Sequence, residues 1–489
     1  MNHQTFRHVP LLLLVAGLNG IRPAAAQTQG PAPATGQPAR SSPLSIPTGS
    51  FLGGIPTGTL TGDVQKITII DAISRALDHN LGVLTSSDNL GRAEGARTRI
   101  LSQLLPNVNG RLSETRQTIN LAAFGFGGGG ADSPFAGIPT IVGPFNVFDV
   151  RLYLSQAVLD FGAMNGVKAE SHNVEAARLT YQSARDYVIH VAGNLYIRAL
   201  ADSARADAAR IQAQTAQTLF TQATDLKQSG IIAGIDVLRA EVQFSTLTQR
   251  ATVAANDFEK SKLAIARVIG LPLGQRFELD PVIPSLPVSD LSVDAAVEIA
   301  YKTRPDYKAA MERVSAAEAT RKSIVGEALP SIRVNADVGA IGLSPSDAQK
   351  TFAVSGAVNV PIFQGNRTHG RLLEADADIR SRKSEAEDLK ASIYYEVRTA
   401  FLDLDATATQ LAVAGKTRDL ANQQLIQARD RFAAGIANNV EVVQAQDAVA
   451  IATEQFISAQ YGFDLAQGAI VRGTGTSEDM LRQLLGGAR

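Results

Sequence analysis

The sequence contains neither cysteine nor tryptophan in its 489 residues. Without cysteine the chain has no disulfide bond, no thiolate metal ligand, no cysteine nucleophile and no lipid attached to an N-terminal cysteine. Its charges nearly cancel, with 47 aspartates and glutamates against 46 lysines and arginines. This balance gives no broad electrostatic reason to expect a nucleic-acid partner.

Signatures of enzyme chemistry are also missing from the sequence. A run of glycines at 127–130 lacks the Lys-Ser/Thr that completes a phosphate-binding loop, and no Gly-x-Ser-x-Gly elbow occurs. The histidines beyond the N-terminal segment lack the paired spacing of a metal site; they are His79, His172, His190 and His369. We therefore expect neither an enzyme nor a site for a cofactor or metal.

The N-terminal segment resembles an export signal. Arg7 and His8 precede the apolar residues 11–18, and Ala24-Ala25-Ala26 follows. This order is typical of a signal peptide, here residues 1–26, with a short anchoring helix as the alternative. No other stretch reaches the roughly eighteen apolar residues of a transmembrane helix. Residues 27–62, rich in proline, glycine and small polar residues, predict a flexible leader.

The rest of the sequence presents one arrangement twice. A helical pattern ends at Leu105-Pro106 and again at Leu329-Pro330, and two alternating segments follow each time. Each pair leads into a long stretch rich in alanine, glutamine and arginine that ends in a glycine turn. A duplication of this length indicates one supersecondary unit used twice. We predict repeats at residues 63–280 and 281–473, followed by a tail at 474–489.

Four segments of about ten residues alternate between apolar and polar side chains, which predicts strands with one apolar face. This length suits a tilted strand that crosses a bilayer. A half-buried soluble sheet shows the same alternation, but the export signal and the lack of spanning helices favour a membrane. The predicted lipid-facing residues are Phe148, Val150, Leu152, Leu154, Ile332, Val334, Val338, Phe352, Val354 and Val358. The first segment alternates from Val108 to Leu112 and loses the pattern at Glu114 and Arg116.

Four strands cannot close a barrel by themselves. An open sheet edge would leave backbone donors and acceptors unpaired in hydrocarbon, which lipid does not tolerate. If the strands span a membrane, several copies must share one barrel. Two copies would supply eight strands and three would supply twelve, and the pattern does not choose between them.

Two helical stretches are too long for a compact domain. They run without proline from about Gly162 to Ser229 and from about Gly365 to Ala434, or about 100 Å each at 1.5 Å per residue. Return helices are expected near 236–269 and 441–471, and entry helices near 71–104 and 294–328. Coiled-coil spacing appears at Ile393, Val397, Ala400, Leu404, Ala408 and Leu411.

Taken in this order, the motifs resemble the outer-membrane efflux protein family, the TolC-like channel-tunnels. The resemblance covers residues 67–473. Its marks are Leu-Pro before each odd strand, a Phe-Gly or Phe-x-Gly signal after each even strand, and Gly-x-x-x-x-x-Asp/Glu-Val at both turns. It implies a homotrimer with a twelve-stranded barrel in outer-membrane lipid. It also implies a periplasmic helical tunnel that docks to an adaptor protein and an inner-membrane transporter.

The resemblance also implies a closed periplasmic aperture near the two glycine turns. Its acidic positions fall on Asp236 and Glu441, and a further acidic position of the family is Gln444 in this sequence. Gly230 and Gly435 are the corresponding helix-turn hinges. Polar closing links of the family fall on Ala437 and Phe432, which cannot form them, so Arg239 and Arg431 are the candidate substitutes.

These observations predict a mainly α protein with a membrane β-sheet, in which a coiled-coil helical barrel continues a β-barrel shared between subunits. The predicted function is a passive exit channel in the cell outer membrane with a periplasmic extension, serving efflux or type I secretion. The alternative is a periplasmic coiled-coil scaffold or adaptor without a pore.

Overall fold

The computed structural model describes residues 49–124, 139–284, 291–434, 436 and 439–486. The predicted signal peptide, the start of the leader and the hinge residue Gly435 lie outside the described residues, as does Ala437. The following paragraphs concern the unit formed by residues 48–489.

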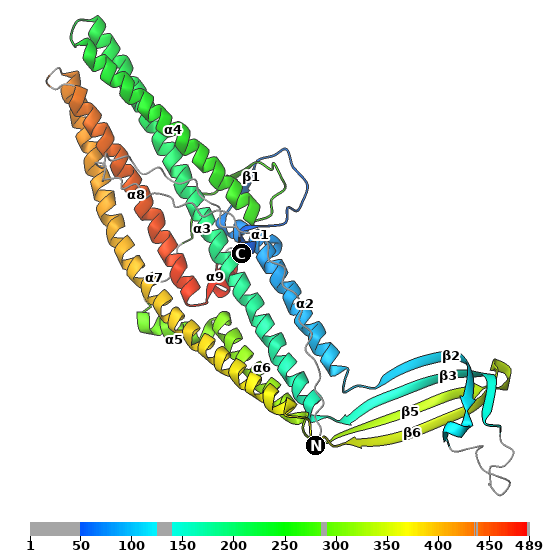
Figure 1. The fold of residues 1–489 in the computed structure, drawn as a ribbon. Helices are drawn as coiled ribbons and strands as arrows, with labels where there is room; N and C mark the ends of the chain where they lie inside the picture. Colours follow the sequence, from blue (N-terminus) through cyan, green and yellow to red (C-terminus); the bar gives the residue numbers. More distant parts are fainter. Residues whose placement is uncertain (1–48, 125–138, 285–290, 435, 437–438, 487–489) are drawn as a thin grey trace, which may run out of the picture. The chain divides into compact units, whose positions relative to one another are not determined.

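The described chain contains the same series of elements twice (Figure 1). Each series has two entry helices, a β-hairpin, a very long helix and a return helix. The first comprises α1 (Ile69–His79), α2 (Leu81–Leu101), β2 (Asn107–Asn120), β3 (Ile141–Leu159), α3 (Phe161–Gln228) and α4 (Gly234–Val268). The second comprises α5 (Val293–Thr303), α6 (Pro305–Gly326), β5 (Ser331–Gly342), β6 (Gln349–Asn359), α7 (Arg367–Ala433) and α8 (Asn439–Gly473). The helix α9 (Ser477–Gly486) follows.

The two hairpins form one antiparallel sheet in the order β2-β3-β5-β6. Its register places Val108 opposite Leu154 in the first hairpin and Ile332 opposite Val358 in the second. The central pair, β3 and β5, joins Leu154 to Ala336. Among the described residues, β2 and β6 are therefore the two edges of the sheet.

One face of this sheet is apolar and the other is polar, as the alternation predicts. A row across the apolar face runs from Leu152 to Val338 and Phe352, and the last of these is 79% exposed. On the polar face Arg151 forms an ion pair with Asp149 and lies 3.9 Å from Asp337. The first strand also continues through Glu114 and Arg116, because β3 pairs with both residues and the register shifts only beyond Gln117.

The long helices agree closely with expectation. α3 has 68 residues and α7 has 67, so each is about 100 Å long. α3 packs against α4 and α7 packs against α8. None of the helices in the described part of the chain combines the length and the apolar character needed to cross a bilayer.

The coiled-coil seam is confirmed at its start but shifts further on. Ile393, Val397 and Ala400 are buried, whereas Ala408 is exposed because Thr407, one residue earlier, faces Gly462 of α8. The predicted Ala408 position is therefore wrong.

Each predicted entry helix is in fact two helices. Asn80 ends α1 and caps α2 by accepting a hydrogen bond from the Gly82 amide at 2.8 Å. In the second repeat Pro305 takes the first position of α6, where its missing N–H costs nothing. Sequence periodicity continues across both breaks, which explains the error.

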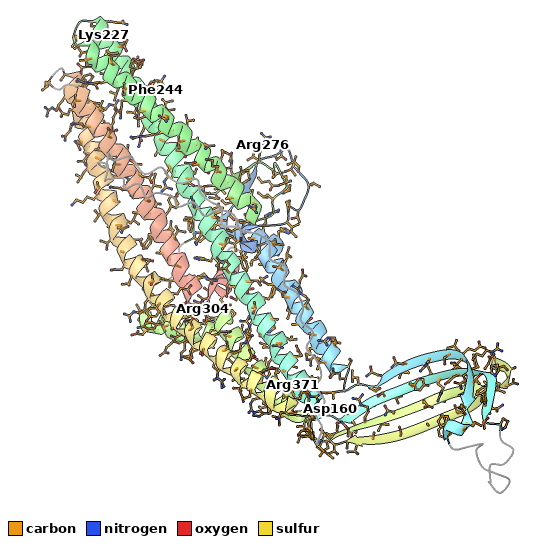
Figure 2. The ribbon with its side chains drawn as sticks, viewed as in Figure 1. Asp160, Lys227, Phe244, Arg276, Arg304 and Arg371 are labelled. Atoms are coloured by element: carbon orange, nitrogen blue, oxygen red, sulfur yellow. The ribbon has the colours of Figure 1, made fainter. Side chains whose placement is uncertain are left out.

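Ion pairs connect helices of the second repeat. α6 and α7 are joined by Glu318 with Lys383 at 2.9 Å and by Arg321 with Asp376 at 2.6 Å. The buried Arg304, labelled in Figure 2, lies between α5 and α6. It pairs with Asp306 at 2.6 Å and with Glu396 of α7 at 2.7 Å.

The main core lies where α1, α3 and the end of α4 meet. The Tyr196 hydroxyl is fully buried there and donates to the carbonyls of Ile67 and Asp280. Ile67 is the last residue of β1 (Gln65–Ile67), and Asp280 follows β4 (Phe277–Leu279); the two strands form a small parallel sheet.

The last part of the predicted flexible leader is held against the helices. The Asn80 side chain donates to the Phe51 carbonyl at 2.7 Å, and the Phe51 ring lies against Gly82, where a Cβ would collide with it. Residues near Phe51 therefore belong to the folded body, and the leader prediction extends too far.

Candidate functional site

The α3–α4 turn forms the first helical tip. Gly230 adopts a left-handed φ of +73°, a conformation that disfavours other residues. The Ile231 amide donates to the Leu226 carbonyl at 2.9 Å, which closes the end of α3. Lys227 marks this tip in Figure 2.

Asp236 lies in the first turn of α4, where the helix dipole favours a negative charge. Its carboxylate is 3.1 Å from Arg239, and its side chain is only 16% exposed. Of the two arginines named as substitutes, Arg239 is thus paired with the first acidic position.

The second tip, between α7 and α8, repeats this charge arrangement. Glu441 lies in the first turn of α8, and Arg431 in the last turn of α7 lies 3.6 Å from its carboxylate. Gln444, one turn further on, is exposed. Each acidic residue of the predicted aperture therefore has an arginine partner in its own hairpin.

The structure also brings the two tips together within one chain. The buried Asn439 donates its side-chain amide to the main-chain carbonyl of Asp236 at 2.8 Å. Further along both helices, the Gln243 amide of α4 donates to the Asp447 carboxylate of α8 at 3.0 Å. Sequence reasoning missed Asn439 and Gln243, because neither carries a distinctive local signal.

An apolar cluster lies beneath these polar links. Phe432 is 4% exposed and packs with Leu219 of α3 and Val442 of α8. The position where the family pattern has a polar link therefore contributes to a hydrophobic contact between the hairpins. The predicted loss of the hydroxyl link at Phe432 is consistent with this packing.

A second cluster joins α3 to α9 halfway along the hairpins. Arg185 pairs with Glu478 at 3.1 Å. Burial, reinforced by the charge of Glu478, raises the pKa of the neighbouring Asp186 to about 6. Burial, together with the nearby Arg472, lowers the pKa of His190 to about 4.

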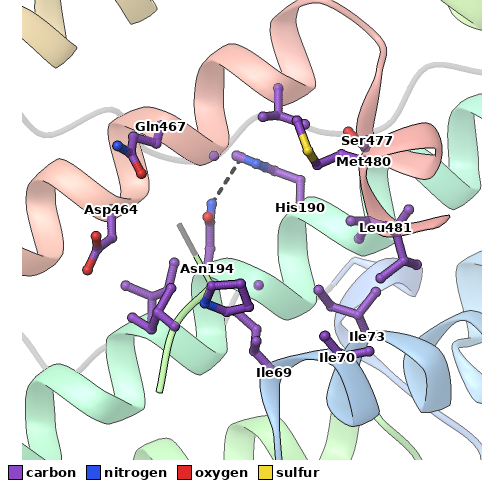
Figure 3. Close-up of a pocket in the computed structure, with 17 residues that line it drawn as sticks. Ile69, Ile70, Ile73, His190, Asn194, Asp464, Gln467, Ser477, Met480 and Leu481 are labelled. Atoms are coloured by element: carbon purple, nitrogen blue, oxygen red, sulfur yellow. Dashed lines mark hydrogen bonds between the residues drawn. The ribbon is translucent and has the colours of Figure 1, made fainter. Parts of the chain in front are cut away.

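His190 also borders a small pocket between α1, α3, α8 and α9 (Figure 3). Its ring lies 2.9 Å from the Asn194 amide, and Asp464, Gln467 and Ser477 supply further polar groups. The remaining wall is apolar, with Ile70 and Leu481 among its members. Among the described residues, no group of three or more His, Asp or Glu side chains could hold a metal ion.

Two strand hairpins with one apolar face, joined to helices of about 100 Å, define a subunit of an outer-membrane channel with a helical tunnel. The model of the outer membrane efflux protein family matches residues 296–476 of the chain. The predicted family, fold class and location in the outer membrane are confirmed. Channels of this family form trimers within tripartite efflux systems.

Individual relatives support this assignment. The toluene efflux pump outer membrane protein TtgF of Pseudomonas putida is 24% identical over 405 residues, covering 79% of each chain. The alkaline protease secretion protein AprF of Pseudomonas aeruginosa is 21% identical over 328 residues, covering 64% of this chain and 66% of the relative. The Campylobacter jejuni CmeC outer membrane channel has the same fold, with a TM-score of 0.72 at 15% identity over 94% of this chain and 98% of that chain.

The chain is accordingly a non-enzymatic outer-membrane channel protein of the kind used in efflux and type I secretion. The alternative of a periplasmic scaffold without a pore is set aside, because neither the relatives nor the fold match points to one.

Proposed function

We propose that three copies of this chain form a passive duct whose periplasmic end is closed by the α3–α4 and α7–α8 tips. The observation that carries the proposal is the pair of direct links between the tips, from Asn439 to Asp236 and from Gln243 to Asp447. In this proposal an adaptor protein and an inner-membrane transporter engage the tips, and the transporter supplies the energy.

The open sheet supports assembly into a shared barrel. β2 and β6 are edges in the described chain, and unpaired edges are not tolerated in hydrocarbon. The apolar face carries exposed side chains such as Val338 at 58% and Val354 at 71%. Their exposure in one chain is explained if this face meets lipid, while the polar face with Arg151 and Asp149 lines the lumen.

Two of the helices carry rows of exposed apolar side chains. On α4, the exposed Ile235, Leu238 and Val242 follow the three-four spacing of a coiled-coil seam. On α7, Tyr395 and Leu402 are exposed and lie two helical turns apart. Stripes of this kind suit packing between helices of neighbouring copies, which would close the helical tunnel.

The contacts between the tips are weak enough to break and form again. Single hydrogen bonds and ion pairs contribute only about 0.5–1.5 kcal/mol each, so a docking partner can replace them. Gly230 and Gly435 are the proposed hinges, since glycine permits the change in backbone angles that separates the helices. Asp236 and Glu441, three of each in the trimer, would give the mouth a negative potential that favours cations.

In this proposal, the inner-membrane transporter determines which substance passes through the duct. The relatives are named for toluene efflux and for alkaline protease secretion, so the proposal covers both small molecules and polypeptides.

Reconstitution tests the proposal. We expect the detergent-purified protein to have the mass of three chains by light scattering and to give small, cation-selective currents in planar bilayers. A stable monomer, or a folded protein that inserts without current, would overturn it.

A further inference from the structure

The end of β6 has no pairing strand on its outer side in the described chain, whereas the end of β3, its counterpart in the first repeat, is paired with β5. β3 extends to Leu159, and its last residues are held by β5, where Leu159 lies opposite Ile332. β6 ends at Asn359, and the following Ile362 and Phe363 are 94% and 86% exposed. Two adjacent apolar side chains this exposed beside a sheet edge mark an uncovered contact surface.

The internal repeat identifies the counterparts. Leu105-Pro106 and Leu329-Pro330 precede β2 and β5, so Val108 corresponds to Ile332. Val108 lies opposite Leu154, and Ile332 lies opposite Val358. Leu154 therefore corresponds to Val358, and by the same step Leu159 corresponds to Phe363.

The central strand pair then serves as a template for the missing pair. Within the chain β3 pairs with β5, joining Leu154 to Ala336 and Tyr153 to Asp337. Replacing β3 by β6 and β5 by β2 turns these pairs into Val358 with Leu112 and Ala357 with Ser113. The template pair Leu159–Ile332 becomes Phe363 with Val108.

The helices support the same order. α3 packs against both α2 and α6, and α7 packs against α6. The order α2-α3-α6-α7 thus repeats the strand order β2-β3-β5-β6. In both layers the next neighbour by repetition is the first element of another copy, which is a head-to-tail interface that can close into a ring.

We propose that β6 pairs antiparallel with β2 of the next copy in the register Val358 to Leu112 and Ala357 to Ser113. This pairing extends β6 by the residues 360–363 and covers Phe363 with Val108 of that copy. The inference rests on the proposed shared barrel and adds its register and its docking residue. Both Val358 and Leu112 belong to the apolar face, so the register keeps that face continuous.

The two junctions between sheet and helices differ in one informative way. The first junction joins β3 to α3 and contains Gly162. The end of α6 packs against it at Gly326, where a Cβ would come within 2.6 Å of the Gly162 nitrogen. The counterpart of Gly326 at the end of α2 is Ser102, which has a Cβ. The second junction turns instead through left-handed Gly365 and Asn366, with φ of 57° and 62°. In the proposed pairing, this different path leaves room for the larger Ser102 of the neighbouring copy.

Introduced cysteines test the register without background, because the chain has none. The double variants Ala357→Cys with Ser113→Cys and Val358→Cys with Leu112→Cys occupy adjacent antiparallel pairs. One of them is a non-hydrogen-bonded pair, whose closer side chains suit a disulfide. We expect mild oxidation of the assembled protein to convert most of at least one variant into disulfide-linked trimers on non-reducing gels.

Two controls accompany these variants. Leu154→Cys with Ala336→Cys, the template pair, should oxidise within one chain and leave monomers on the gel. Ala357→Cys with Thr115→Cys lies two residues out of register, where the side chains are about 7–8 Å apart, and should cross-link poorly. Preferential cross-linking of this shifted pair, or no cross-linking of either in-register pair in conducting trimers, would overturn the register. A cysteine-free protein that neither trimerises nor conducts would instead overturn the duct.

Phe363 gives a second readout. Phe363→Ser should lower the temperature at which the oligomer dissociates in detergent. Ile362→Ser should lower it less, because its counterpart Val158 stays 62% exposed at a bulge in β3 although that strand is paired on both sides. An equal or larger effect of Ile362→Ser would contradict the docking role of Phe363.

Discussion

Asn439, the first residue of α8, donates its side-chain amide to the main-chain carbonyl of Asp236 in the first turn of α4, at 2.8 Å. The bond joins the two helical hairpins of one chain at their tips. Because its acceptor is a backbone atom, it survives any change in the charge of Asp236.

Removing this bond should loosen the closed mouth. Asn439→Ala leaves a carbonyl without its donor, at a cost of about 1–3 kcal/mol to the closed form. We expect a higher mean single-channel conductance in planar bilayers. The matched control is Gln455→Ala, an exposed position on the same helix away from the tip, and equal conductance in both variants would show that the tip bond does not restrict the pore.

The acidic residues should govern ion selectivity. Glu441→Gln and Asp236→Asn each remove three carboxylates from the mouth of a trimer, so the cation-to-anion permeability ratio should fall and fall furthest in the double variant. Reversal potentials in a salt gradient measure the ratio. Glu241→Gln, an exposed acid on α4, is the control, and an unchanged ratio in the double variant would remove both residues from the mouth.

The two faces of β6 should respond oppositely to charge. Val354→Arg places a cation on the face expected to meet lipid, which costs about 2–4 kcal/mol near the bilayer centre. Ala353→Arg, next to it, places the same cation on the lumenal face. Only Val354→Arg should reduce the amount of heat-sensitive trimer in outer-membrane fractions, and equal loss in both variants would argue against a lipid-facing assignment.

Asp186 and His190 of α3 should make opposing contributions to the pH dependence of the free energy of unfolding. Burial raises the pKa of Asp186 from 3.8 to about 6, so the folded protein retains a proton that the unfolded chain releases, and the fold loses stability as pH rises through this range. Burial lowers the pKa of His190 from 6.5 to about 4, so the unfolded chain takes up the proton, and the fold gains stability as pH rises. The two contributions oppose each other between about pH 4 and pH 6.

Single variants should therefore expose each effect. The unfolding temperature of Asp186→Asn should rise with pH over this range, and that of His190→Gln should fall. Wild type should change less than either variant. Parallel curves for all three proteins would show that neither group has a shifted pKa.

The glycine at the first junction should be intolerant of a side chain. Gly326→Ser forces a Cβ toward the Gly162 backbone at 2.6 Å, and backbone cannot yield as a flexible side chain can. We expect a lower unfolding temperature, whereas Ser102→Gly at the corresponding position after α2 should have a small effect. Circular dichroism melting of the two variants makes the comparison.

Much of the fold can be predicted from the sequence because its periodicities are long and occur twice. The alternation around Val338 and Val354 predicts both the strands and their common apolar face. The interruption at Asn80 escapes prediction, because the apolar spacing continues through it. The boundary of the leader escapes for another reason: Phe51 is held by contact with Gly82, far away in the sequence.

The site shows a similar division. Asp236 and Glu441 follow from the resemblance to the family, which has acidic residues after the glycine turns, and Arg239 and Arg431 follow from their nearness in sequence. Asn439 and Gln243 do not, because their partners belong to the other hairpin. The burial of Phe432 depends in the same way on Leu219, more than two hundred residues earlier.

The unpaired edges β2 and β6 also bear on how the protein reaches its membrane. A single sheet with two free edges has no stable place in hydrocarbon, whereas in water its apolar face invites aggregation. In the proposed trimer we therefore expect membrane entry and subunit association to be one event, because the strands can insert stably only when their edges are paired.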